Sequence, residues 1–184
     1  MSHHLPNFIT FLRIILAPVL AVLIEQSQTG PLVLLAFGLF CLAGLSDWLD
    51  GYLARRLNIV SSMGRMLDPI ADKLLIAAVL LGLSAQRGAE PVFLIPALAI
   101  VMREFLVSGL REYLAGSKVI IKVSWAAKWK TALQMVSLGC LIISPALSFG
   151  VWVDYTGLTL LWLSAALTVQ TGLSYFIASR AHFR

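Results

Sequence analysis

Charged residues are scarce in this chain of 184 residues, where Asp, Glu, Lys and Arg together make up 12% of the sequence. A soluble domain of average composition carries about twice that share, so water cannot be the main environment of the surface. Hydrophobic residues account for 59% of the sequence, and its mean hydropathy is +0.89. About 20 apolar residues span a bilayer core. The composition therefore predicts an integral membrane protein without room for an additional soluble domain.

Cysteine and histidine are also rare. Each of the two cysteines, Cys41 and Cys140, lies inside an apolar run, which favours small buried hydrophobic residues over a disulfide or a metal-binding pair. Of the three histidines, His3 and His4 belong to a polar N-terminus. The sequence therefore gives no support for a disulfide framework or a zinc site.

The apolar residues form six long segments separated by short polar ones. They predict an all-α fold of six transmembrane helices, in a single membrane domain over residues 1–184. Gly and Pro mark most of the turns. The expected helices cover residues 8–24, 32–54, 66–85, 92–115, 124–143 and 157–179. Connections are expected at residues 27–31, 55–62, 86–91 and 116–123, and in a loop through Pro145, Gly150 and Asp154.

The distribution of basic residues predicts the orientation in the membrane. If both termini lie on one side, the charged residues in loops on the opposite side are Glu25, Arg87, Glu90 and Asp154. Every Lys and Arg except Arg87 then lies on or near the terminal side, which the positive-inside rule places in the cytoplasm. The net charge of +5 favours contact with anionic membrane lipid. Because the basic residues are not interleaved with exposed aromatics, a nucleic-acid partner is not expected.

Four aspartates stand out against this apolar background. Asp47 and Asp50 are three residues apart at the expected cytoplasmic end of the second helix, and Asp68 and Asp72 are four apart at the start of the third. Such spacings place the members of each pair on one helix face. The short connection brings both pairs to the same depth. We therefore expect four carboxylates to converge at the cytoplasmic side of the bundle.

Four like charges at that depth repel one another unless cations compensate them. Oxygen ligands without nearby His or Cys favour Mg²⁺ or Mn²⁺ over zinc. Two such ions are expected to bind a diphosphate and stabilise the attacking and leaving oxygens of an in-line displacement.

Residues around the aspartates fit a nucleotide site. Gly51 and Gly64 have no Cβ, so a nucleotide can approach the backbone there, and Arg55 is suited to diphosphate oxygens. Structural interpretations compete with these roles. Asp68 before Pro69 also fits a helix N-cap followed by proline at the first helical position. The glycines also suit turns or packing, and Arg55 suits a membrane-surface position.

The complete pattern is D-x-x-D-G-x-x-A-R-x8-G-x-x-x-D-x-x-x-D, and it resembles the signature of the CDP-alcohol phosphatidyltransferases. The chain meets every fixed position, at Asp47, Asp50, Gly51, Ala54, Arg55, Gly64, Asp68 and Asp72. The resemblance implies a six-helix membrane enzyme with CDP-diacylglycerol as donor, bound at Gly51, Ala54, Arg55 and Gly64. It implies that the four aspartates bind the metal ions, with Asp72 also acting as general base toward the acceptor hydroxyl. Members of the family tend to form homodimers.

Polar and basic residues in the later helices bear on the acceptor. The fourth expected helix carries an unusual polar load for a spanning segment, at Arg103, Glu104, Ser108, Arg111 and Glu112. The fifth begins with Lys128 and Lys130, followed by Thr131 and Gln134. Cations facing the metal site would suit a phosphorylated acceptor. In the alternative interpretation, Glu104 simply pairs with the arginines, and Lys130 extends its ammonium toward the membrane surface.

A wider resemblance covers nearly the whole chain. Residues 5–13, 67–73, 103–112 and 128–131 are similar to bacterial family members of the cytoplasmic membrane that use sn-glycerol 3-phosphate as acceptor. It implies that the product is phosphatidylglycerophosphate, with release of CMP. Thr10, with Asn7 and Arg13, then forms a polar stripe facing the site. The alternatives are another acceptor (inositol phosphate, serine or phosphatidylglycerol), a divalent-cation transporter, and a lipid-binding scaffold without turnover.

Overall fold

The computed structural model describes residues 4–57, 62–116 and 125–179, and within them every regular element is helical. The elements are α1 (His4–Gln26), α2 (Pro31–Leu57), α3 (Ser62–Gln86), α4 (Pro91–Gly116), α5 (Trp125–Ile143), the short 3₁₀ helix η1 (Ser144–Ala146) and α6 (Gly150–Ser179). The all-helical fold with six long helices predicted from the sequence is confirmed.

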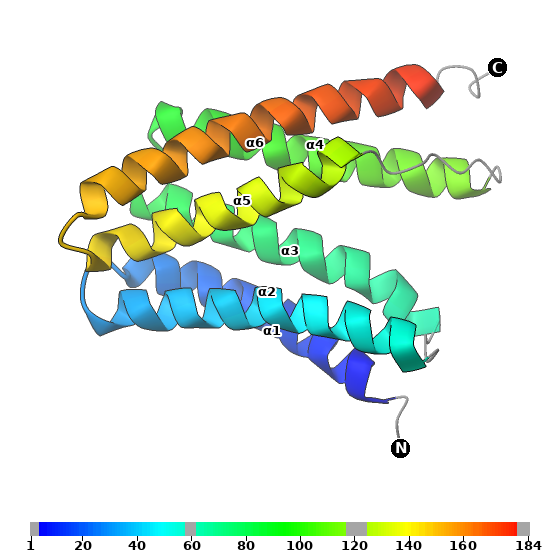
Figure 1. Cartoon of the computed structure of the whole chain (residues 1–184), viewed down its shortest axis with the longest axis horizontal. Helices are drawn as coiled ribbons and strands as arrows, with labels where there is room; N and C mark the ends of the chain where they lie inside the picture. Colours follow the sequence, from blue (N-terminus) through cyan, green and yellow to red (C-terminus); the bar gives the residue numbers. More distant parts are fainter. Residues whose placement is uncertain (1–3, 58–61, 117–124, 180–184) are drawn as a thin grey trace.

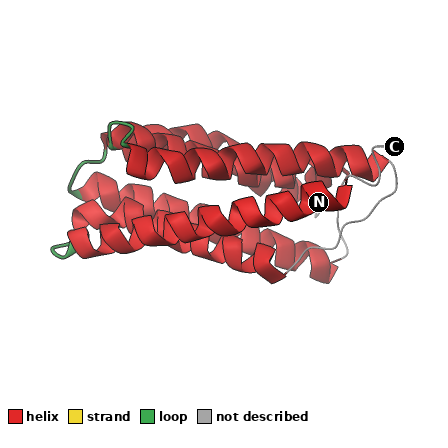
Figure 2. Cartoon of the chain, turned by 90° about the horizontal axis from the view of Figure 1, so that it is seen from above, coloured by secondary structure: helices red, strands yellow, loops and turns green. Residues whose placement is uncertain are grey.

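The six helices run along the long axis of one bundle (Figures 1 and 2). The connections at residues 27–30, 87–90 and 147–149 lie together at one end, called here the connection end. α1 begins and α6 ends at the opposite end, called here the terminal end. Because α2 runs toward the terminal end and α3 starts there, the signature segments of both helices lie at the terminal end.

Two glycines allow close helix contacts in the core. A Cβ on Gly82 of α3 would lie 2.6 Å from the backbone oxygen of Ala21, so α1 and α3 are in near-backbone contact. A Cβ on Gly157 of α6 would lie 2.8 Å from Leu141 of α5. Here the Ser137 hydroxyl donates to the Gly157 carbonyl at 2.8 Å. These contacts fix α1 against α3 and α5 against α6.

Apolar side chains fill the interior and also cover much of the outside. Leu20, Phe93 and Leu161 are fully buried, whereas Leu106 is 70% and Trp152 is 76% exposed. So much exposed apolar surface is unusual for a protein surrounded by water. By length and composition, residues Pro91–Tyr113 of α4 and Gly150–Ile177 of α6 are each able to cross a membrane.

Some predicted boundaries were wrong. α6 begins at Gly150 and not at residue 157, so Asp154 lies inside the helix and not in a loop. Glu25 lies in the last turn of α1, also not in a loop. α3 begins at Ser62, so Asp68 and Pro69 are inside it, and the N-cap interpretation of Asp68 was wrong. The expected basic connection at residues 116–123 lies, beyond Gly116, outside the described residues.

Candidate active site

The backbone positions of the four aspartates agree with the predicted arrangement. Asp47 and Asp50 lie in the last three turns of α2, and Asp68 and Asp72 lie in the second and third turns of α3. Both segments belong to the terminal end of the bundle. Among the described side chains are those of Asp68 and Asp72, which are exposed. The surroundings of the other predicted donor and metal residues are not part of what the structure describes; these residues are Asp47, Asp50, Gly51, Ala54, Arg55 and Gly64.

Asp68 is held by the first helix. The hydroxyl of Thr10, a buried residue of α1, donates a hydrogen bond to Asp68 Oδ1 at 2.7 Å. The close α1–α3 contact brings these two residues together although they are far apart in the sequence. Thr10 was predicted to face the acceptor phosphate. The structure places it against a predicted metal ligand, so its hydroxyl orients that carboxylate.

Asp72 lies at a small polar cavity formed by three helices. The cavity has a volume of about 40 Å³ and is lined by Asp72, Lys73, Ile76, Glu104, Lys130, Thr131, Gln134 and Met135. Such a volume admits a water-sized group rather than a whole substrate. Lys130 and Gln134 are almost completely buried there, at 6% and 4% exposure. A cation and an amide of α5 therefore meet a carboxylate of α3 at the terminal end.

Glu104 links two cations beside this cavity. Its Oε1 accepts from Lys130 Nζ of α5 and, at 3.1 Å, from Arg103 Nη1 of α4. The expected pairing of Glu104 with an arginine is confirmed. Lys130 does not extend toward the surface as the alternative interpretation had it, because its ammonium is buried against Glu104. One carboxylate and two cations leave a net positive charge, which suits a phosphate group.

The residues predicted to bind the acceptor phosphate face two directions. The Ser108 hydroxyl accepts a hydrogen bond from Lys73 of α3, so Ser108 faces α3. Arg103 and Arg111 contact α6 instead: Arg103 Nη2 donates to Thr171 Oγ1 at 2.9 Å, and the Arg111 guanidinium lies 5.7 Å from the ring centre of Tyr175. Neither arginine lines the Asp72 cavity. The side chain of Lys128 lies outside the described ones.

Five polar residues of the cavity were not included among the predicted acceptor-binding residues, although all except Lys73 belong to the polar load of the fourth and fifth helices: Lys73, Glu104, Lys130, Thr131 and Gln134. The sequence did carry a signal for two of them. Lys130 and Gln134 are four residues apart, so they share a face of a helix that is otherwise mostly apolar. A cation and an amide on one face of an apolar helix indicate a polar neighbour, here Asp72.

The described carboxylates fit part of a metal site. Asp68 and Asp72 supply oxygen donors one helical turn apart, which is the donor type that Mg²⁺ and Mn²⁺ prefer. Within the described residues, no group of three or more His, Cys, Asp or Glu side chains is close enough to hold a metal ion. The other two predicted metal ligands, Asp47 and Asp50 of α2, have side chains outside the described ones.

The sequence model of the family described as CDP-alcohol phosphatidyltransferase matches residues 3–170. The chain belongs to this family. The resemblance inferred from the eight signature positions is thus confirmed. As a CDP-alcohol phosphatidyltransferase, the chain is expected to have its chemistry where the signature lies, at the terminal ends of α2 and α3. The match ends at residue 170, before the last turns of α6.

Full-length relatives carry one common name, CDP-diacylglycerol–glycerol-3-phosphate 3-phosphatidyltransferase. The protein of that name from Rickettsia felis is 47% identical over 185 residues, covering 100% of this chain and 99% of the relative. The one from Rickettsia bellii is 44% identical over 184 residues, with the same coverage. The one from Escherichia coli K12 is 37% identical over 183 residues, covering 98% of this chain and 97% of the relative.

Proposed function

We propose that the chain transfers the phosphatidyl group of CDP-diacylglycerol to sn-glycerol 3-phosphate, giving phosphatidylglycerophosphate and CMP in phospholipid biosynthesis. One observation carries this proposal: the chain is 37–47% identical, over almost its full length, to family members named for that reaction. No described contact favours inositol phosphate, serine or phosphatidylglycerol as acceptor. Along α3 beyond Asp72 the buried residues are apolar, including Leu75, Val79 and Leu83, which gives no support for a cation-transport path.

In the proposed reaction, Asp72 takes the proton of the primary hydroxyl of glycerol 3-phosphate as general base. The hydroxyl oxygen attacks the β-phosphorus of the donor, and the bond between that phosphorus and the oxygen of CMP breaks. The donor is bound at Gly51, Ala54, Arg55 and Gly64. Asp47, Asp50, Asp68 and Asp72 hold Mg²⁺ or Mn²⁺, in our proposal two ions. Bound there, the metal supplies positive charge to the diphosphate.

The acceptor phosphate is proposed to bind beside Asp72, between α4 and α5. The proposed set consists of Arg103, Ser108, Arg111 and Lys128 with Thr10 at its edge, and we add Lys130 and Lys73 because of their positions. Lys130 lines the cavity with Asp72, and Lys73 donates to Ser108. Because their ammonium groups are held by hydrogen bonds, they are positioned before the acceptor arrives, which lowers the entropic cost of binding.

The proposed setting is the bacterial cytoplasmic membrane. Six helices cross it in one domain, with both termini and the active site on the cytoplasmic side, and the protein forms a homodimer. Support for the membrane comes from the exposed apolar side chains and from the two helices that are long and apolar enough to span it. Support for the orientation comes from the basic residues: in the topology predicted from the sequence, every Lys and Arg except Arg87 lies on or near the side of the termini. Homodimer formation rests on the family resemblance alone.

The experiment that tests this function follows CMP release by detergent-solubilised protein with CDP-diacylglycerol, Mg²⁺ and a panel of acceptors. The panel contains glycerol 3-phosphate, inositol phosphate, serine and phosphatidylglycerol. We expect release with glycerol 3-phosphate alone, and its loss on addition of EDTA. Release with another acceptor would overturn the acceptor assignment but keep the reaction type. No release with any acceptor, from well-folded protein, would overturn the enzymatic function.

A further inference from the structure

The side chain of Arg103 crosses from α4 onto α6 over a glycine. A Cβ built on Gly172 would lie 2.8 Å from Arg103 Cγ and 3.2 Å from its Nε. Real Cβ atoms do not approach so closely, and Cγ is near the base of the side chain, so it cannot move without carrying the guanidinium with it. The absence of a side chain at residue 172 therefore makes room for Arg103 in its present position.

The neighbouring residue fixes the far end of the same side chain. Thr171 Oγ1 accepts a hydrogen bond from Arg103 Nη2 at 2.9 Å. The same hydroxyl donates its hydrogen to a backbone carbonyl of the preceding turn, at 2.8 Å to Leu167 or 3.0 Å to Thr168. Since a hydroxyl has only one hydrogen, Thr171 is directed toward Arg103 as an acceptor. The pair of Thr171 and Gly172 thus forms a shaped seat for one guanidinium.

This seat is connected to the candidate active site through charged contacts. Arg103 Nη1 donates to Glu104 at 3.1 Å, and Glu104 also accepts from Lys130. Lys130 lines the cavity that contains Asp72. The contacts therefore run without interruption from uncharged residues of α6, through α4, to the buried ammonium of α5.

The Arg103 side chain has free space beside it that other rotamers could occupy. Its side chain borders an apolar groove of about 560 Å³ between α4 and α6, lined by residues such as Met102, Leu106 and Phe176. An arginine side chain has about 2 kcal/mol of rotamer entropy to lose when it is held in one position. Without Thr171 and Gly172, the guanidinium would be free to sample the space beside the groove, and Glu104 would lose a fixed partner.

We propose that Thr171 and Gly172 are positioning residues for the acceptor phosphate: they hold Arg103, and through Glu104 they hold Lys130, in the geometry that binds glycerol 3-phosphate. This inference rests on the proposed function. Both residues lie beyond residue 170, where the family match ends, so the family signature does not account for them. Their effect is on acceptor binding, and the donor site on α2 and α3 is independent of it.

The test compares four single variants by steady-state kinetics with each substrate varied in turn. Thr171→Val removes the hydroxyl that accepts the hydrogen bond from Arg103 and keeps the shape of the side chain, whereas Thr171→Ser retains the hydroxyl. Gly172→Ala displaces Arg103. Thr168→Val is the matched control, because the buried Thr168 hydroxyl has no hydrogen-bond partner in the part of the chain that the structure describes. Circular dichroism and thermal unfolding in detergent establish that each variant is folded.

We expect Thr171→Val and Gly172→Ala to raise the KM for glycerol 3-phosphate about fivefold, the loss of one charge-assisted contact acting indirectly. The KM for CDP-diacylglycerol should stay unchanged. Thr171→Ser and the control Thr168→Val should both have the same KM for glycerol 3-phosphate as the unmodified protein. A purely structural role of these residues would instead lower thermal stability and affect both substrates equally.

Arg103→Met separates this inference from the function on which it rests. If Arg103→Met raises the acceptor KM while Thr171→Val and Gly172→Ala leave it unchanged, the positioning role is overturned and the acceptor site stands. If Arg103→Met itself leaves the acceptor KM unchanged, the proposed acceptor site is wrong at Arg103.

Discussion

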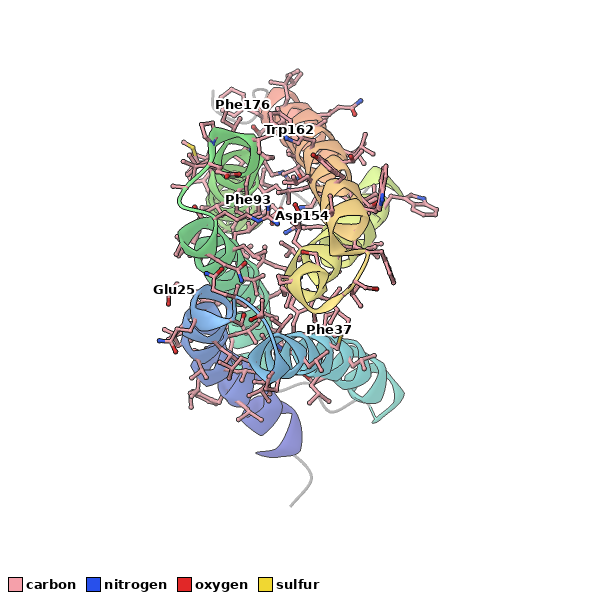
Figure 3. The ribbon with its side chains drawn as sticks, turned by 90° about the vertical axis from the view of Figure 1, so that its left-hand side faces the viewer. Glu25, Phe37, Phe93, Asp154, Trp162 and Phe176 are labelled. Atoms are coloured by element: carbon pink, nitrogen blue, oxygen red, sulfur yellow. The ribbon has the colours of Figure 1, made fainter. Side chains whose placement is uncertain are left out.

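The two ends of the bundle use charged residues in opposite ways. At the connection end, Arg87 of the α3–α4 turn forms an ion pair with Asp154 of α6, and the Ser144 hydroxyl donates to the same carboxylate at 3.2 Å. The guanidinium also lies 5.5 Å from the ring centre of Phe93. In a view onto this end, Asp154 and Phe93 point toward the middle of the bundle, while Glu25 lies on its outside (Figure 3). Arg87 and Asp154 are thus each paired with the opposite charge.

At the terminal end, two cations, Arg103 and Lys130, share a single acid, Glu104. Asp68 and Asp72 are exposed, whereas Lys130 is buried behind them in contact with Glu104. A cation and an acid paired one to one, as at the connection end, stabilise a fold and leave no net charge, whereas two cations that share one acid leave positive charge for a ligand. Carboxylates at the surface and an ammonium in the interior suit a site that binds metal and phosphate. The comparison indicates that the Arg87–Asp154 pair at the connection end serves structure, whereas in the proposed function the charges at the terminal end serve chemistry.

The largest contrast is expected between two aspartates, one at each end. Asp72→Asn removes the proposed general base and should lower kcat about 10³-fold. Asp154→Asn, which changes the same atoms at the connection end, should leave kcat unchanged and lower thermal stability. Parallel measurement of CMP release and unfolding midpoint checks both. Equal loss of activity in the two variants would abolish the distinction between the ends.

Two cations provide the next contrast. Lys130→Met should raise the KM for glycerol 3-phosphate about tenfold or more, since a contact to a charged group is lost. Arg87→Met should not change that KM. The acceptor dependence of CMP release at saturating CDP-diacylglycerol measures the effect. An unchanged KM in Lys130→Met would remove Lys130 from the acceptor site.

Two hydroxyls that donate to carboxylates allow a finer comparison. Thr10→Val removes the hydrogen bond to Asp68 and should lower turnover about fivefold, with a higher Mg²⁺ concentration needed for half-maximal rate. Ser144→Ala removes the hydrogen bond to Asp154 and should leave the Mg²⁺ dependence unchanged. Titration of activity with Mg²⁺ distinguishes them. A normal Mg²⁺ dependence in Thr10→Val would contradict the role of Thr10 in orienting a metal ligand.

The smallest effect on turnover belongs to Arg87. Because its pair with Asp154 is largely buried, at 16% and 28% side-chain exposure, Arg87→Met leaves a carboxylate without its cation and should destabilise the fold by about 2 kcal/mol. The double variant Arg87→Met/Asp154→Leu should recover part of that loss, because both charges are then gone. Thermal unfolding of the single and double variants decides this. Lower stability in the double variant than in Arg87→Met would show that the ion pair is not the relevant interaction.

The helix count and the placement of the signature segments of α2 and α3 at one end of the bundle were predictable because both depend on local pattern. Apolar segments of spanning length predict the helices, and aspartates at spacings of three and four on such segments indicate a functional site. The start of α6 was not predictable in the same way. Gly157 looks like a boundary in the sequence, but in the structure it is the point where α6 approaches Leu141 of α5. A single sequence does not distinguish a glycine that ends a helix from a glycine inside a helix that permits close packing.

The orientation of α4 was also beyond the sequence. Helical periodicity states which residues share a face, but it does not state which helix that face meets. Ser108 faces Lys73 of α3, and Arg103 faces α6 because Gly172, far along the chain, leaves space for it. The sequence left two interpretations of Lys130 open, a cation facing the metal site and a lysine that extends to the membrane surface. Its burial required Glu104, a partner on another helix.

The close contact between α1 and α3 has a consequence for the order of biosynthesis. Thr10 and Asp68 are 58 residues apart, so at about 5–20 residues per second the ribosome adds the second some 3–12 s after the first. During this interval the face of α1 that carries Ala21 has not yet met Gly82. The contact between α1 and α3 therefore forms only after the third helix has been synthesised, whereas α2, which also contacts α1, is made earlier. In the proposed function, Thr10 can orient Asp68 only from that point on.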